Sequence, residues 1–137
     1  MSNMSIELHD SDIEEIKVNN NEINIIFTSV IIHVSDGRPG IDAGDVYVQK
    51  AELLFQGNCG LVGKIKEYPV LISHGTLQIN EFIWENEIPV PLNRNGKVRF
   101  SISQRDIGDE IIITSESVLL TLLDKPKYLE TFPGKLN

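Results

Sequence analysis

Apolar and polar residues alternate over long stretches of this chain, and in two stretches the alternation changes phase. Within Glu22–Val34 the apolar positions are odd-numbered up to Phe27 and even-numbered from Val30 onward. Within Asp45–Phe55 the phase changes at Gln49-Lys50. A period of two indicates a β-strand, whose successive side chains point to opposite faces. Because a change of phase moves every later side chain to the other face, it predicts a β-bulge or sharp bend in each strand.

A third change of phase follows Ile79 and precedes Phe82, and it predicts a third bend within Gly75–Trp84. The two longer stretches also contain the unbroken apolar runs Ile25–Phe27 and Val30–Ile32. A strand buried on both faces would give such runs without any bend. Bent strands at the corner of a sandwich or barrel are the interpretation that we prefer.

Residues that favour strands dominate the composition. Isoleucine, valine, threonine and the aromatic residues make up 43 of the 137 residues, whereas alanine, the best helix former, occurs only twice. A chain of this length fits one domain, so we expect a single all-β domain over residues 1–137, with residues 1–4 disordered. We predict a single antiparallel β-sandwich or open barrel of about eight strands, two or three of them bent or bulged, with little or no helix.

Turn signals at short spacing place the strands. Short connections favour antiparallel pairing, since parallel strands need long crossovers. The predicted strands are Ile13–Val18, Glu22–Val34, Asp45–Gln56, Gly75–Trp84, Ile88–Leu92, Lys97–Ser103, Glu110–Thr114 and Ser117–Leu123.

The segment Ile88–Leu92 carries prolines at alternate positions, which predicts an edge strand because proline has no N–H for a ladder. Asn95-Gly96 supplies the positive-φ residues of a tight hairpin, which would pair this strand with Lys97–Ser103. Near the start of the chain, Asp10–Ile16 has the spacing of a helix capping box. A strand that begins at Ile13 is the interpretation that we prefer.

The chain carries 20 acidic and 12 basic residues, a net charge of −8, which argues against a nucleic-acid partner. Four of the basic residues lie in or beside Lys97–Ser103, so we expect the acidity on the other faces and in the amino-terminal half. No apolar run is long enough for a membrane helix, no leader-like segment opens the chain, and the single Cys59 cannot form an internal disulfide. These features favour the cytoplasm and predict no membrane partner.

The loop Ser35–Asp45 is the segment that we expect to contact a partner. It contains three glycines and four charged residues, and loops of this kind often carry binding functions. Its spacing does not match the twelve-residue calcium loop, and a solvated hairpin loop is the alternative. The predicted binding residues are Asp36, Arg38, Asp42 and Asp45, together with Trp84 elsewhere in the chain.

The candidate metal ligands are His9, Asp10 and His33. Histidine beside carboxylates can hold a divalent metal or act as a base, and His74 could add a third imidazole. Their flanking residues lack the spacing of a known ligand motif. Local turn capping around Asp10, and structural or surface roles for the histidines, are the alternatives.

Four other features have weaker functional interpretations. Trp84 could be a binding platform or rim packing, and Cys59 could be a nucleophile only beside a base. Arg94, Lys97, Arg99 and Arg105 could form a phosphate-binding face or a solvated face. The sequence lacks four common motifs: a phosphate-binding glycine loop, a dinucleotide fingerprint, a nucleophile elbow and a Cys-x-x-Cys pair. It therefore predicts no cofactor.

Short segments resemble known bacterial proteins. Leu8-His9-Asp10-Ser11, followed by alternating apolar residues, resembles the start of small bacterial β-rich families, some of which look like immunity proteins of polymorphic toxin systems. Gly75-Thr76-Leu77, Ile88–Pro91 and Tyr128–Gly134 are similar to features of a small uncharacterised bacterial all-β family. This resemblance supplies no functional residues to transfer.

The leading hypothesis is a non-enzymatic domain that binds a basic protein partner, in particular an immunity protein that neutralises a toxin. One alternative is a small-molecule or carbohydrate module that uses Trp84, Tyr47, Tyr68 and Tyr128. Others are a metal-dependent enzyme that uses the histidines and a homo-oligomeric structural protein.

Overall fold

The fold was obtained as a computed structural model that describes residues 2–105 and 109–135. The described residues form nine strands in one antiparallel sheet and contain no helix, which confirms the predicted all-β class. It follows that no helix of this part of the chain could cross a bilayer. The strands are β1 (Asn3–Asn19), β2 (Glu22–Ser35), β3 (Gly44–Gln56), β4 (Gly60–Val62), β5 (Val70–Ile79), β6 (Phe82–Glu85), β7 (Glu87–Val90), β8 (Asn93–Gln104) and β9 (Glu110–Phe132).

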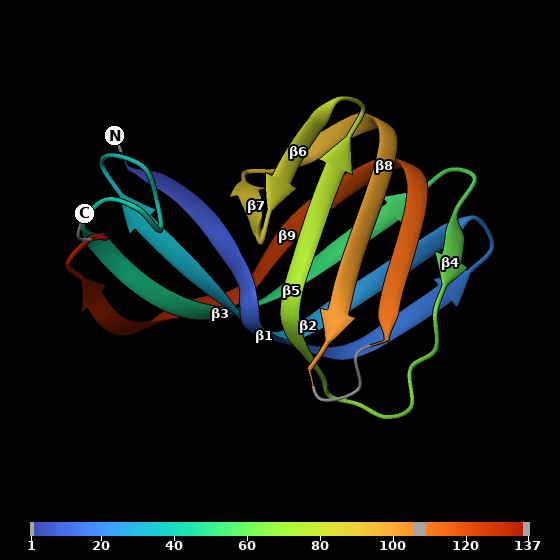
Figure 1. Cartoon of the computed structure of the whole chain (residues 1–137), viewed down its shortest axis with the longest axis horizontal. Helices are drawn as coiled ribbons and strands as arrows, with labels where there is room; N and C mark the ends of the chain where they lie inside the picture. Colours follow the sequence, from blue (N-terminus) through green and yellow to red (C-terminus); the bar gives the residue numbers. More distant parts are fainter. Residues whose placement is uncertain (1, 106–108, 136–137) are drawn as a thin grey trace.

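The sheet divides into two lobes that share four long strands (Figure 1). In the closed lobe, neighbouring strands pair in the order β5-β8-β9-β3-β2-β1. A short contact between β1 and β5 then completes a partial ring. In the open lobe, the other halves of β1, β2, β3 and β9 continue as a fan with β7 at its edge. The described part of the chain begins and ends in the open lobe. The architecture is consistent with the predicted sandwich or open barrel.

The lobes meet where neighbouring strands are bulged. The β2–β3 register shifts between Phe27 and Val30, and the β3–β9 register shifts between Val48 and Lys50. These are the two positions at which the sequence alternation changes phase, so both predicted bends are confirmed. The β1–β2 register shifts at the same level, between Glu7 and Asp12. The bulges therefore form a line across the sheet, along which the strands bend and their side chains exchange faces.

The closed lobe contains most of the apolar core. Phe27, Leu53 and Phe55 are fully buried, and the ring of Phe55 lies 5.8 Å from that of Phe100. The alternation predicted for Lys97–Ser103 is also confirmed, because Val98, Phe100 and Ile102 are all buried. In this strand, the apolar positions of the sequence pattern are the positions that the core buries.

Two predicted turns are different in the structure. The third change of phase is a hairpin rather than a bend, because β5 ends at Ile79 and Asn80, with a φ of 55°, turns the chain into β6. Asn95-Gly96 does not form a hairpin and lies inside β8 at a register shift. The positive φ of Gly96 serves this bulge, where the Lys97 N–H donates to Asn80 Oδ1 (2.9 Å).

Strand boundaries account for the other corrections. Ile88–Leu92 was expected to pair with Lys97–Ser103, but β7 pairs with β1, and its place at the end of the sheet confirms the predicted edge. Glu110–Thr114 and Ser117–Leu123 are one strand, β9. Asn3 and Met4 are ordered in β1, which also replaces the helical alternative at residues 10–16; Met1 lies outside the described residues.

We predict that Ser11→Ala destabilises the protein by about 1–3 kcal/mol, because it leaves a buried backbone group unpaired at the bend. Ser11 is fully buried, its Oγ donates to Glu7 O (2.7 Å), and the Ile31 N–H donates to it (3.4 Å). Urea unfolding measures the change. Ser103→Ala, on a half-buried serine within β8, is the control, and an equal loss in both variants would contradict a special role of Ser11.

Candidate functional site

The predicted contact loop joins β2 to β3 at the outer end of the open lobe. Its fold is set locally: the Arg38 N–H donates to Asp42 Oδ2 (2.7 Å), and the Ile41 and Asp42 N–H groups donate to Arg38 O (3.0 and 2.8 Å). Ser35 Oγ donates to Ala43 O (2.8 Å) and closes the base. The loop is therefore a compact, internally bonded structure, and its exposed residues hold defined positions.

The four predicted loop residues differ in their surroundings. Asp36 and Arg38 are exposed, and Ser2 Oγ donates to Asp36 Oδ1 (3.3 Å). Asp42 is exposed but caps the loop, whereas Asp45 is half-buried at the start of β3. All four stay within one lobe, while Trp84 lies in the other on β6.

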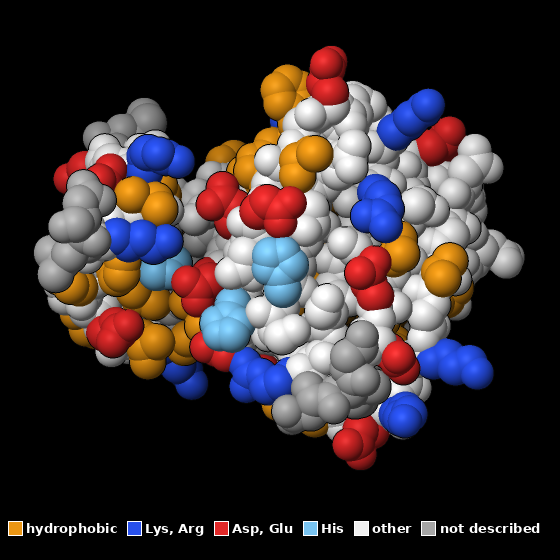
Figure 2. Space-filling view, viewed as in Figure 1, with side chains coloured by type: hydrophobic (Ala, Val, Ile, Leu, Met, Phe, Trp, Pro, Cys, Tyr) orange, Lys and Arg blue, Asp and Glu red, His pale blue; other side chains and the backbone are white. Residues whose placement is uncertain are grey.

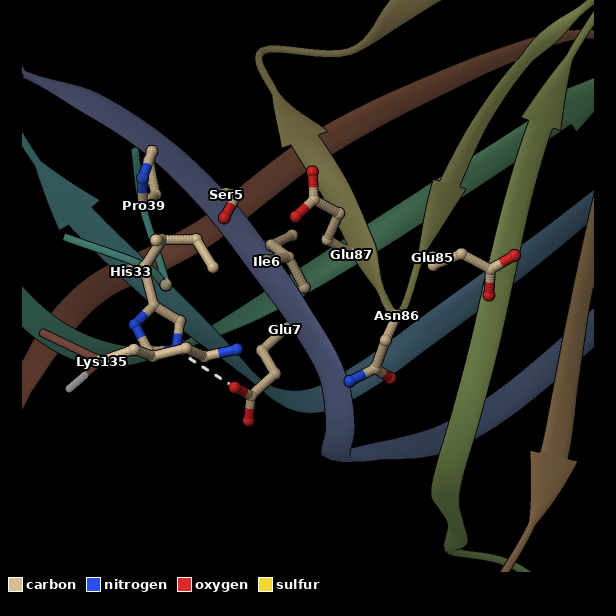
Figure 3. A pocket seen from close by; sticks show the side chains of 11 residues that line it. Ser5, Ile6, Glu7, His33, Pro39, Glu85, Asn86, Glu87 and Lys135 are labelled. Carbon is tan, nitrogen blue, oxygen red and sulfur yellow. Dashed lines mark hydrogen bonds and ion pairs between the residues drawn. The ribbon is translucent and has the colours of Figure 1, made fainter. Parts of the chain in front are cut away.

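Three clefts border this loop. One, of about 220 Å³, lies between the lobes and is lined by β1, the loop and the β6–β7 turn (Figure 3). A second, of about 480 Å³, runs between the loop and β7, and a third, of about 250 Å³, lies at the loop's base. The loop predicted from the sequence therefore lines all three of these clefts.

The linings of these clefts are acidic. They carry six carboxylates against the cationic side chains of Arg38 and Lys135. Red side chains gather along the hollow between the lobes in Figure 2. We call these six residues the acidic lobe surface: Glu7, Asp36, Asp42, Asp45, Glu85 and Glu87. Its excess of negative charge is a large part of the net charge of the chain.

His33 is the most buried charged or titratable side chain beside the first cleft, with 8% of its surface exposed. Its Nε2 lies 3.3 Å from Glu7 Oε1, and its ring meets that of Phe132 edge-on. Among the described residues its buried Nδ1 has no hydrogen-bond partner. Donation from Nε2 to Glu7, with Nδ1 as the bare acceptor, fits this environment, and it holds the Glu7 carboxylate in place.

The predicted metal group does not form within the described part of the chain. His9 Nδ1 donates to Ser73 O (2.7 Å) and its Nε2 lies 3.5 Å from Asp10, which itself binds Arg105. His33 faces Glu7, and His74 Nε2 lies 3.1 Å from Glu85. Each histidine therefore has its own carboxylate, and no three ligand side chains converge among residues 2–105 and 109–135.

Trp84 packs at the rim of the closed lobe. It stacks with Phe82 at 6.2 Å between ring centroids, and the Arg94 guanidinium lies 5.9 Å from its ring. The clefts described above contain neither Trp84 nor the three tyrosines that a carbohydrate module would use. The packing interpretation of Trp84 accounts for these contacts.

The predicted basic face is divided among separate contacts. Arg94 covers the aromatic pair, Arg99 lies 3.8 Å from Glu110, and Arg105 binds Asp10. Of the four basic residues, Lys97 and Arg99 line a common cleft, and Arg94 and Arg105 do not line it. The four side chains therefore do not act as one phosphate-binding group.

Cys59 is half-buried and donates weakly from Sγ to Asn21 O and Phe55 O (both 3.4 Å). Burial raises the pKa of this thiol, and the carboxylates of Glu22 and Glu116 act in the same direction. A raised pKa keeps the sulfur protonated, which is the opposite of an activated nucleophile.

Sequence reasoning missed Glu7, Glu85 and Glu87. Glu7 lies on β1, and the other two flank Asn86 at the β6–β7 turn, about 80 positions later in the chain. Their neighbourhood depends on the β1–β7 pairing, for which no local pattern exists. Comparisons with protein-family models, with curated proteins and with solved structures found no match.

We predict that Asp12→Asn raises the midpoint of thermal unfolding at pH 7. Burial raises the pKa of Asp12 above its ordinary value, more than Arg105 lowers it, so folding disfavours the charged form. The charged Asp12 carboxylate therefore destabilises the folded protein at pH values above its folded-state pKa. The stability gained from the amide of the Asp12→Asn variant should vanish below about pH 3, where Asp12 is protonated in both the folded and the unfolded protein.

Calorimetry of the two proteins from about pH 3 to pH 7 measures this difference, with the exposed Glu15→Gln as the control for lost charge. A lower midpoint for the Asp12 variant at pH 7 would mean that attraction to Arg105 outweighs burial and would contradict the prediction.

Proposed function

We propose that this protein is a non-enzymatic domain that binds a basic protein partner through the acidic lobe surface. The observation that carries the proposal is the gathering of six carboxylates, opposed by two cations, in clefts around one internally bonded loop. Charge of one sign on a hollowed surface speeds encounter with a partner of the opposite sign and disfavours other partners. The apolar residues Pro39 and Ile41 of the loop supply contact area beside this charge.

The class of partner that we propose is a toxin, so that the protein is an immunity protein that neutralises it in the cytoplasm. Two features support this: the resemblance of the short segments around Leu8–Ser11 to bacterial families of that kind, and the net charge of −8, which suits a basic nuclease. The lone Cys59 is consistent with a reducing compartment.

A capture experiment tests the proposal. The tagged protein is used as bait in an extract of its source cells, and we expect it to retain one basic protein. The variant Asp36→Asn/Asp42→Asn/Asp45→Asn removes three charges but keeps an acceptor atom for Ser2 and for the Arg38 N–H. We expect this variant to retain at least tenfold less of that protein, and less still at high salt.

The control variant Glu15→Gln/Glu67→Gln/Glu81→Gln removes the same charge from exposed positions outside the three clefts and should retain the partner fully. The captured protein should arrest growth when expressed alone, and co-expression of the wild-type protein should restore it. Equal losses in both variants, or an acidic captured protein, would refute the proposed surface; a partner that is harmless alone would refute the immunity role.

A further inference from the structure

The first two clefts form one continuous groove. Both are lined by Ser5, Pro39, Ile41 and Glu87. The floor of the groove is the paired strands β1 and β7, and the loop is its wall: in Figure 3, Ser5 lies between Pro39 on one side and Glu87 on the other. We call it the β1–β7 groove.

The β1–β7 register orders the chemistry along this groove. Ser5 pairs with Pro89, and Glu7 pairs with Glu87. Apolar side chains of Pro39, Ile41 and Pro89 surround the first pair, whereas the second pair is two carboxylates. Two residues of a strand span about 7 Å. The groove therefore offers an apolar site and an acidic site about that far apart.

The Glu7–Glu87 pair is an unfavourable arrangement that a cation would relieve. Residues that pair across two strands share a face, and like charges directly opposite each other destabilise a sheet. In Figure 3 the carboxylate of Glu7 turns toward His33 and that of Glu87 turns away from it. Within the described residues, Lys135 lines the same cleft but no lysine or arginine forms an ion pair with either glutamate. The acidic site is thus built from two cross-strand carboxylates that have no lysine or arginine ion-pair partner among the described residues, and it lies beside a buried histidine.

We propose that the β1–β7 groove binds an extended segment of the partner in which an apolar residue is followed, two positions later, by arginine or lysine. Side chains at positions i and i+2 of an extended chain lie on one face about 7 Å apart, which matches the two sites. The cationic group sits at Glu7 and Glu87, and the apolar side chain packs against Pro39, Ile41 and Pro89.

Recognition takes place through side chains rather than through strand addition. Pro89 in β7 and Pro91 just after it have no N–H, so an added strand would find few donors along this edge. This inference rests on the proposed function, because it names the part of the basic partner that the acidic lobe surface receives.

Fluorescence anisotropy with synthetic peptides tests the inference. The probe is an acetylated, labelled eight-residue peptide of glycine and serine with leucine at its third and arginine at its fifth position. We expect saturable binding that weakens about tenfold when arginine is replaced by glutamate, when leucine and arginine are made adjacent, or when the protein carries Glu87→Gln. The exposed Glu81→Gln should leave binding unchanged.

Thermal unfolding gives a second readout that a structural role for Glu87 would not produce. Because Glu87→Gln removes like-charge repulsion, it should raise the unfolding midpoint while it weakens peptide binding. A lowered midpoint, or equal binding of the arginine and glutamate peptides, would overturn the inference. If the partner is captured in the charge-dependent way described above but the peptides do not bind, the proposed function stands and the groove inference fails. If the peptides bind but no partner is captured, the groove binds such peptides and the proposed function fails.

Discussion

The bulges that cross β1, β2, β3 and β9 at one level determine the shape of the molecule. A regular strand keeps alternate side chains on one face along its whole length, so four long strands without bulges would make one continuous, two-faced sheet. The bulges bend all four together, and the ring therefore closes on one side of the line while the strands fan out on the other. Asp10 and Asp124 take positive φ at these bends, which suits aspartate better than bulky residues.

This constraint also sets the chemistry of the surface. On the closed side the bent strands wrap around an apolar core, whereas the open side has too little sheet to close and leaves hollows beside its connecting loop. The opposed glutamates of β1 and β7 cost a few tenths of a kcal/mol in a sheet that could do without them. Such a cost is consistent with the proposed binding role of this surface, because local losses of stability are commonly tolerated where function needs them.

Local sequence predicted the features that depend on local geometry. The phase changes near Thr28-Ser29 and Gln49-Lys50 located two bulges, and the prolines of Ile88–Leu92 identified an edge. The hairpin predicted at Asn95-Gly96 was wrong because a glycine with positive φ occurs in β-bulges as well as in hairpin turns. The loop of the candidate site was found in the same local way, but its acidic partners were not, since Glu7 and Glu87 meet only through a pairing between distant strands.

The two described ends of the chain have a practical consequence. Ser2 lines the second cleft and Lys135 lines the first. The Lys135 N–H also donates to Ile41 O (2.8 Å), which holds the loop against the end of the chain's described part. An affinity tag, fluorescent protein or surface tether joined next to Ser2 or Lys135 would therefore lie beside the clefts and compete for the space that the proposed partner needs. An internal attachment point on the far lobe, such as the exposed Asn80-Glu81 turn, keeps a reporter clear of it.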